Sequence, residues 1–339
     1  MKLVLKWSFL MSLLIIFSNC NNKSPSEADL RLEKKGQTAR LINEPDPEEV
    51  RIQDLVKQYD AFITEKFKEL DLPGLAYAIV KDGKVISVQT HGVQEKGEEA
   101  LINEHTVFRL ASISKGFAAT IAGLLVDQGY MDWDDKVTTH LPKFELRSSS
   151  QTDALTIRHT LSHTSGLKEY SGVSLINKDL SCASILSALK KAKIEAKPAK
   201  VFAYQNAIFS AISEIGKSAT DLSYGSLLDS MIFNPLGMTD ASSSYKSMMA
   251  NENRAIPHVF SKGRGWNSVD IRKKWYNVGP AAGVNASISD MGIWLQAMLG
   301  HHPTVIPKSV LNEIFKRHIP INEDSKYYET WAPGLSDAY

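Results

Sequence analysis

Residues 108–115, Phe-Arg-Leu-Ala-Ser-Ile-Ser-Lys, lead into an apolar segment that ends at Gly129, and the rest of the chain is interpreted from this stretch. Ser112 and Lys115 are three residues apart, so on a helix they share one face. The apolar segment would bury the lysine stem, which makes the neutral, basic form of an amine easier to reach. Free N–H groups at a helix start favour the negative charge of an oxyanion. The stretch predicts a serine nucleophile with an amine beside it.

The Ser-x-x-Lys spacing alone is weak evidence because it occurs four times in the chain. The three other pairs are Ser165/Lys168, Ser187/Lys190 and Ser243/Lys246. Only Ser112/Lys115 lies between an apolar approach and an apolar helix. Context, rather than spacing, selects this pair.

Composition excludes several classes of function. The chain has 339 residues, with 39 Lys and Arg against 38 Asp and Glu, so the net charge of +1 gives no field that would recruit nucleic acid. The sequence contains neither a Gly-x-Ser-x-Gly elbow nor a phosphate-binding glycine loop.

His159 and His163 lack the adjacent Glu of a zinc hydrolase, so we expect them to be structural and expect no metal or cofactor. We expect His318 to lie at the surface.

The first 20 residues have the form of a secretory signal: a short basic start, an apolar run and a cysteine at position 20. The arrangement around Cys20 resembles the lipobox of bacterial lipoproteins, with Phe17 and Asn19 as departures from it. We expect cleavage and lipidation at Cys20, with an uncleaved anchor as the alternative. Residues 21–46 are polar and read as a flexible tether. Cys182 then has no partner for a disulfide.

The periodicity from residue 47 onward predicts an α+β domain over 47–339. A helix should run from Pro47 to just before Pro73-Gly74. Two apolar runs around Asp82-Gly83 predict an antiparallel hairpin of strands 75–80 and 85–90. Residues 156–233 read as mostly helical, residues 251–277 as a polar connection, and a capped helix should follow from 289 to 299.

Several motifs in one order carry a family resemblance. Residues 108–115 resemble the first motif of the class C β-lactamase and penicillin-binding-protein-like serine hydrolases. Further matches are the His-Thr-Ser-Gly-Leu loop within 156–167, the Tyr-x-Asn motif within 202–206, the Pro-Leu-Gly-Met turn within 234–238, and the loop and helix at 279–284 and 287–299. The resemblance implies an antiparallel sheet flanked by helices, together with a mostly helical part.

The resemblance also implies the roles of the site residues. Ser112 would attack a carbonyl carbon, Lys115 and Tyr204 would exchange its proton, and Asn206 would bind Lys115 and the substrate amide. The substrate would be a small-molecule or peptide acyl compound: an ester, an amide or a β-lactam. The lipid anchor would place the protein in a bacterial cell envelope, on the periplasmic or outer-membrane face.

The sequence departs from the family pattern at its end. Beyond Asn206 there is no Lys-x-Gly or His-x-Gly, the third motif, whose strand supplies an oxyanion donor and one wall of the groove. Residues 327–335 resemble the lead-in to such strands. We therefore expect a truncated chain or a fragment, whose hairpin keeps an unpaired edge, with a naturally complete variant as the alternative. A catalytically impaired lipoprotein that binds peptide or cell-wall fragments is the alternative function.

Overall fold

The computed structural model describes residues 46–321, 328 and 329. Its contacts divide the described chain into two units, one ending at Leu70 and the other starting at Asp71. The predicted signal segment, Cys20 and the tether as far as residue 45 lie outside the described residues. Within the described part, no helix is both long and apolar enough to cross a bilayer.

The first unit consists of helix α2 (Pro47–Glu69) and its caps. The carboxylate of Asp46 accepts a hydrogen bond from the N–H of Glu48 at 2.9 Å, which satisfies one of the free donors at the helix start. Pro47 occupies the first turn, where its missing N–H costs nothing. The predicted helix is confirmed, and it ends at Glu69, four residues before Pro73.

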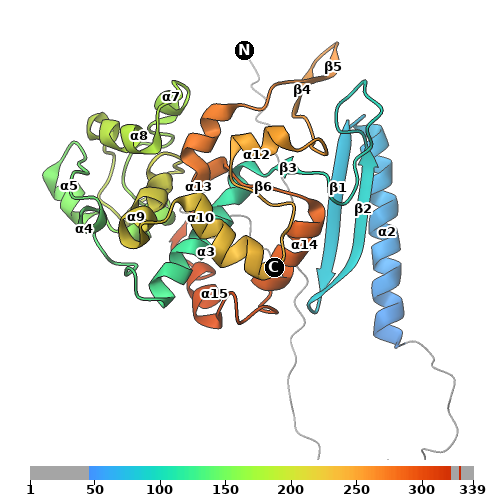
Figure 1. Ribbon diagram of the computed structural model, residues 1–339, viewed down its shortest axis with the longest axis horizontal. Helices are drawn as coiled ribbons and strands as arrows, with labels where there is room; N and C mark the ends of the chain where they lie inside the picture. The colour runs from blue at the N-terminus through green and yellow to red at the C-terminus, as the bar shows by residue number, and fades with distance from the viewer. Residues whose placement is uncertain (1–45, 322–327, 330–339) are drawn as a thin grey trace, which may run out of the picture. The chain divides into compact units, whose positions relative to one another are not determined.

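The second unit contains the predicted hairpin. Strand β1 (Gly74–Lys81) pairs antiparallel with β2 (Lys84–Gly92). The turn residues Asp82 and Gly83 have φ of 48° and 72°, as a two-residue type I′ turn requires. Helix α14 (Ile288–Met298) packs against both strands (Figure 1), and Gln296 donates from Nε2 to the carbonyl oxygen of Gly83 at 2.7 Å. The hairpin is confirmed.

Helix α3 (Ser114–Asp127) forms the centre of the helical body. Its apolar side chains are almost all buried, which agrees with the prediction, and it begins one turn after Leu110. A Cβ atom on Gly123 would lie 2.6 Å from Cγ1 of Val310 in helix α15 (Lys308–Ile314). Glycine at this position therefore allows α3 and α15 to pack closely.

Most of the other helices are short, and several of them pack directly against α3 (Figure 1). The other described helices are α4 (Val137–His140), α5 (Ser149–Ala154), α6 (Ile157–Leu161), α7 (Val173–Ile176), α8 (Cys182–Ala188), α9 (Ala211–Thr220), α10 (Tyr224–Leu228), α11 (Asn234–Leu236), α12 (Tyr245–Ala250) and α13 (Gly279–Ala282), with 3-10 or π turns η2 (Ala111–Ile113), η3 (Leu189–Lys191), η4 (Ile208–Ser210), η5 (Asp229–Phe233) and η6 (Lys273–Val278). As expected, no strand interrupts residues 156–233.

Two of the three other strand pairs in the described part of the second unit are formed by strands of only two residues. Strand β3 (Phe108–Arg109) pairs antiparallel with β6 (Asn285–Ala286), which brings distant segments together beside the start of α3. Strand β7 (Ile319–Pro320) pairs with β8 (Tyr328–Glu329). Only Tyr328 and Glu329 of the expected lead-in at 327–335 are described, and they pair with β7 rather than with the β1–β2 hairpin.

The segment 251–277 differs from its prediction as a polar connection. It contains a hairpin of β4 (His258–Ser261) and β5 (Gly265–Ser268). The rings of Phe260 and Trp266 meet edge to face across the two strands, with their centres 5.4 Å apart, and such cross-strand aromatic pairs stabilise a ladder. The surrounding lysines and arginines concealed this short alternation in the sequence. With antiparallel strand pairs and a mostly helical body, the fold is of the predicted α+β class.

Candidate active site

Ser112 lies in the turn η2, directly between strand β3 and helix α3. The N–H of Leu110 donates to the carbonyl oxygen of Val284 at 2.9 Å, and the N–H of Val284 donates to Oγ of Ser114 at 2.9 Å. These two bonds fix the chain on both sides of Ser112. Ala111 adopts φ of 47°, a left-handed conformation that turns the backbone just before the serine. The Ser112 side chain is exposed to solvent.

Lys115 is fully buried, in contrast to the exposed serine beside it. Its ammonium group donates to Oδ1 of Asn206 at 2.9 Å, to the carbonyl oxygen of Ala281 at 3.0 Å and to Oγ of Ser112 at 3.4 Å. Its Nζ also lies 4.6 Å from the ring centre of Tyr204. A long cationic side chain is thereby held in one position and aimed at the serine oxygen.

Tyr204 completes the cluster. Its hydroxyl donates to Oγ of Ser112 at 2.8 Å, the shortest polar contact that the serine oxygen makes here. Two groups that can carry a proton therefore converge on one exposed hydroxyl. The structure brings together all four residues that the sequence selected for the site: Ser112, Lys115, Tyr204 and Asn206.

The other Ser-x-x-Lys pairs do not form such a cluster. Lys168, Lys190 and Lys246 are all exposed. Lys190 donates to Glu145 at 3.1 Å, which is a surface ion pair. Context in the sequence therefore separated one buried lysine from three solvated ones.

Two contributions to the site were not predicted. The carbonyl oxygen of Ala281, within the matched loop 279–284, accepts from Lys115. His163 accepts a hydrogen bond at Nδ1 from the N–H of Gln205, next to the predicted tyrosine. The sequence marked both segments as family motifs, but it carried no signal for a backbone acceptor or for the tautomer of a histidine.

His159 has the structural role that the sequence predicts. Its Nδ1 accepts from the N–H of Thr156 at 3.2 Å and so forms half of the capping box that begins α6. Burial lowers the pKa of His159, which keeps the ring neutral and able to accept.

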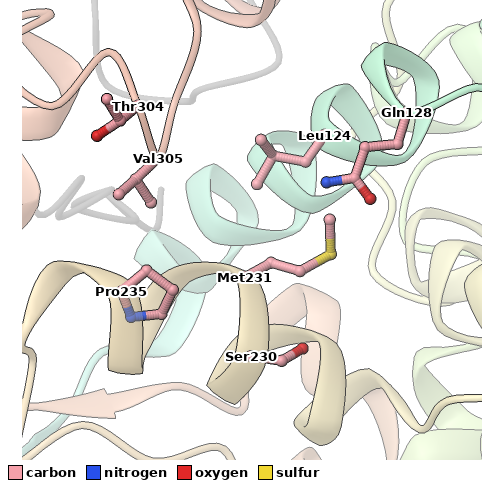
Figure 2. Close-up of a pocket in the computed structure, with 7 residues that line it drawn as sticks. All are labelled: Leu124, Gln128, Ser230, Met231, Pro235, Thr304 and Val305. Atoms are coloured by element: carbon pink, nitrogen blue, oxygen red, sulfur yellow. The ribbon is translucent and has the colours of Figure 1, made fainter.

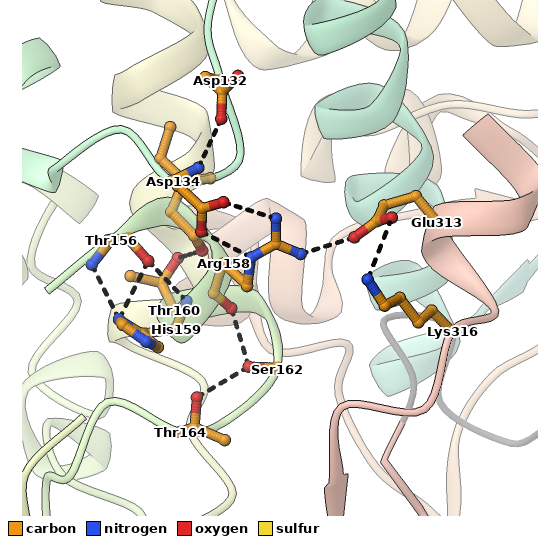
Figure 3. Close-up of polar contacts among 11 residues, drawn as sticks. Asp132, Asp134, Thr156, Arg158, His159, Thr160, Ser162, Thr164, Glu313 and Lys316 are labelled. Atoms are coloured by element: carbon orange, nitrogen blue, oxygen red, sulfur yellow. Dashed lines mark hydrogen bonds and ion pairs between the residues drawn. The ribbon is translucent and has the colours of Figure 1, made fainter. Parts of the chain in front are cut away.

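A second polar cluster surrounds Arg158 (Figure 3). Its guanidinium donates from Nε and Nη2 to the two carboxylate oxygens of Asp134, at 2.7 and 2.9 Å, and from Nη1 to Glu313 at 2.6 Å. A small cavity of about 80 Å³ adjoins the cluster, lined in part by His318. His318 is half-buried rather than a surface residue as expected, because it lines this cavity together with Arg158 and His159 of α6.

A larger cavity of about 210 Å³ lies away from the Ser112 cluster (Figure 2). Leu124 and Gln128, near the end of α3, form one side of it, and Met231 and Val305 lie opposite. At 1.5 Å per helical residue, Leu124 is roughly 15 Å further along α3 than Ser114. This cavity is not part of the site around Ser112.

The helical body, the antiparallel hairpin and the Ser-Lys-Tyr cluster together define the β-lactamase-like class of proteins. The family profile described as Beta-lactamase matches residues 52–335, and the chain belongs to this family. The family that the sequence motifs indicated is therefore confirmed.

Relatives and solved structures agree with this assignment. The chain is 25% identical over 250 residues to Protein flp of Staphylococcus aureus strain MRSA252, covering 73% of this chain and 49% of that protein. It is 28% identical over 233 residues to a D-aminopeptidase of Gluconobacter oxydans, covering 66% of this chain and 41% of that protein. The chain thus spans about half the length of the curated relatives it matches, or less.

Two solved structures share the fold. One is the octameric penicillin-binding protein homologue from Pyrococcus abyssi, with a TM-score of 0.73 at 20% identity, covering 82% of this chain and 64% of that chain. The other is EstCE1, described as a hydrolase with promiscuous acyltransferase activity, with a TM-score of 0.71 at 18% identity, covering 84% of this chain and 83% of that chain.

Proposed function

We propose that the chain carries the catalytic centre of a serine hydrolase, which transfers an acyl group from an ester, an amide or a β-lactam to water through an acyl-enzyme on Ser112. The observation that carries the proposal is the convergence of Tyr204 and Lys115 on the exposed Oγ of Ser112, at 2.8 and 3.4 Å. A weak nucleophile needs an adjacent proton acceptor, and Tyr204 or Lys115 becomes one when it has lost a proton. The D-aminopeptidase and the hydrolase with promiscuous acyltransferase activity among the similar proteins are consistent with this reaction class.

The reaction would proceed in two halves. For this reaction the Lys115–Tyr204 pair starts one proton short of an ammonium and a phenol together, for example as an ammonium beside a phenolate. Oγ of Ser112 bonds to the carbonyl carbon while its proton passes to the pair, and the pair gives that proton to the leaving group as the bond to the carbonyl carbon breaks. Water then attacks the acyl-enzyme and gives a proton to the same pair, and the pair returns it to Oγ as the ester bond breaks, which restores Ser112 and releases the acid. Asn206 holds Lys115 in place during both halves, because its Oδ1 accepts from Nζ at 2.9 Å.

The test is covalent labelling of Ser112 in the folded chain. A fluorophosphonate probe should modify Ser112, detected by peptide mass spectrometry, and Ser112→Ala should abolish the label. Ser243→Ala, at another Ser-x-x-Lys pair, is the matched control and should label normally. A folded chain whose Ser112 stays unmodified would contradict the proposal and favour the alternative of a peptide-binding or wall-binding lipoprotein.

The substrate class can be assigned with the same chain. Fluorescent penicillin, a p-nitrophenyl ester and a D-amino-acid amide each present a different acyl group to Ser112. Penicillin labelling without ester turnover would favour a lactam or cell-wall substrate, whereas ester turnover without penicillin labelling would favour an esterase.

The predicted anchor at Cys20 is a further part of the proposal, and its support is the sequence around the cysteine alone. In a bacterial host, an alkyne-labelled fatty acid should be incorporated into the full chain and should be lost in Cys20→Ser. Cys182→Ser is the control, because the Cys182 thiol is buried. Equal labelling of the wild type and Cys20→Ser would contradict lipidation at this position.

A further inference from the structure

We propose that His163 is a positioning residue for the reaction, which orients Tyr204 toward Ser112 by binding the backbone on both sides of the tyrosine. The inference rests on the proposed function and adds to it a residue that touches neither substrate nor the reacting atoms.

Two hydrogen bonds join His163 to the segment 203–205, one on each side of Tyr204, and we call this pair of bonds the clamp. The carbonyl oxygen of His163 accepts from the N–H of Ala203 at 2.9 Å, and its Nδ1 accepts from the N–H of Gln205 at 3.1 Å. The neighbours of Tyr204 in sequence are thus both bound to one residue. The backbone of Tyr204 itself cannot rotate without breaking one of these bonds.

The continuation of the same loop holds the segment from further points. The N–H of Tyr170 donates to the carbonyl oxygen of Tyr204 at 3.0 Å. The buried side chain of Gln205 donates from Nε2 to the carbonyl oxygen of Lys168 at 2.6 Å. The tyrosine segment is therefore tied to the loop 163–170 at successive residues, with the His163 imidazole as the only side chain of the loop among these acceptors.

The imidazole also packs directly against the tyrosine ring. The ring centres of His163 and Tyr204 are 4.6 Å apart at 38°, and Phe209 lies on the imidazole at 5.2 Å. Full burial lowers the pKa of His163 well below its ordinary value, and the nearby Lys115 acts in the same direction. The neutral ring retains the lone pair on Nδ1 that the clamp requires.

The clamp has a consequence for rate because the contact it controls is short. Tyr204 reaches Oγ of Ser112 at 2.8 Å. A displacement of about 1 Å at such a contact can cost roughly 100-fold in rate, even when its origin lies away from the reacting atoms. A loss of orientation should therefore appear in kcat rather than in KM.

Two substitutions at His163 test separately the hydrogen-bond acceptor at Nδ1 and the aromatic ring. His163→Phe keeps the aromatic packing and removes the acceptor. His163→Asn loses the ring but places an amide oxygen where Nδ1 stood, and asparagine tolerates the φ of 57° at this position. With p-nitrophenyl acetate, kcat should fall about 30-fold in His163→Phe and about 3-fold in His163→Asn, with KM within 2-fold in both.

The outcome that would overturn the inference is a kcat in folded His163→Phe equal to that of the wild type, or higher than that of His163→Asn. Thermal unfolding confirms that each variant is compared well below its midpoint. A second measurement uses the wild-type chain alone: ¹⁵N NMR of His163 should show a proton on Nε2 and none on Nδ1. A proton on Nδ1 would overturn the clamp whatever the variants do.

These results also separate the inference from the proposed function. If the fluorophosphonate probe labels the wild type and His163→Phe at equal rates, only the positioning role fails. If the wild type is not labelled at Ser112, the proposed function fails, and the positioning role fails with it.

Discussion

Two cations of this chain are held in opposite ways. Arg158 is bound by two carboxylates, Asp134 and Glu313, which neutralise its charge. The acceptors found for the buried ammonium of Lys115 are an amide oxygen, a carbonyl oxygen and a hydroxyl, none of which carries a formal charge. Both cations are positioned by several bonds, but their electrostatic surroundings differ.

This difference indicates which of the two cations can take part in a proton transfer. Carboxylates raise the pKa of the Arg158 guanidinium, since hydrogen bonds and charge both favour the ionised form, so this group stays charged and serves as a tie between α6 and α15. The described hydrogen bonds of Lys115 go to neutral oxygens, and a bond from an ammonium to a neutral oxygen is weaker than one to a carboxylate. Placed next to an exposed hydroxyl, the Lys115 amine can give and take a proton during a reaction.

The largest effect is expected from removing the Lys115 amine. Lys115→Met keeps the length and packing of the side chain, and labelling of Ser112 should slow by about 1,000-fold because the proton relay is lost. Lys168→Met, at an exposed Ser-x-x-Lys lysine, is the control and should leave the rate unchanged. Fluorophosphonate labelling kinetics measure both. A Lys115→Met rate close to that of the wild type would remove the distinction between the two cations.

Removal of the Tyr204 hydroxyl should have the next largest effect. Tyr204→Phe keeps the ring that packs against Lys115 and should slow labelling of Ser112 by about 100-fold, since one of two proton carriers remains. Tyr170→Phe is the matched control, because Tyr170 contacts this segment through its ring and backbone N–H. A rate in Tyr204→Phe that matches the Tyr170→Phe rate would show that the hydroxyl is not used.

Replacement of Arg158 should have the opposite effect to replacement of Lys115: the stability should fall and the labelling rate of Ser112 should not. Arg158→Met removes the guanidinium that binds Asp134 and Glu313 and should lower the thermal midpoint by about 4 °C, while the labelling rate of Ser112 stays within 2-fold. Arg147→Met, at an exposed arginine, should change neither quantity. A large loss of labelling in folded Arg158→Met would mean that the cluster in Figure 3 is coupled to the active site, against the comparison drawn above.

The sequence predicted the parts of this molecule that depend on local pattern. The hairpin around Asp82-Gly83 was evident because a type I′ turn demands those residue types. Ser112, Lys115, Tyr204 and Asn206 were identified because each lies in a short motif, although their contacts join segments about 90 residues apart. The order of the motifs along the chain identified the site, which the Ser-x-x-Lys spacing alone could not do.

The missed features depend on tertiary packing. The β4–β5 hairpin is stabilised by the Phe260–Trp266 contact across the strands, which a one-dimensional pattern rich in lysine and arginine does not display. The burial of His318 arises from packing beside Arg158, with which it lines a cavity. The clamp at His163 needs a particular tautomer and two backbone donors, and nothing in the residue types specifies them.

The smallest predicted effect is a pH dependence of stability at the Arg158 cluster. Burial lowers the pKa of His318 to about 4, and the charge of Arg158 acts in the same direction. An unfolded chain has a histidine pKa of about 6.5, so between pH 6.5 and about 4 the unfolded state binds a proton that the native state does not. The free energy of unfolding should therefore fall as pH drops through this window and become independent of His318 below it.

The carboxylate of Asp134 loses its contribution to the free energy of unfolding in a different pH window from His318. The effects of the two groups can therefore be measured separately. The hydrogen bond from Arg158 lowers the pKa of Asp134, so its stabilisation is present above its ordinary value of 3.8 and is lost only as pH falls below it. Between pH 7 and 5, His318→Asn should reduce the drop in thermal midpoint by about 2 °C relative to the wild type, with the exposed His301→Asn as control. If the thermal midpoint falls equally in His318→Asn and in the wild type, His318 is already protonated in the native state at pH 5. The Arg158 cluster would then contain a second positive charge, that of the His318 imidazolium.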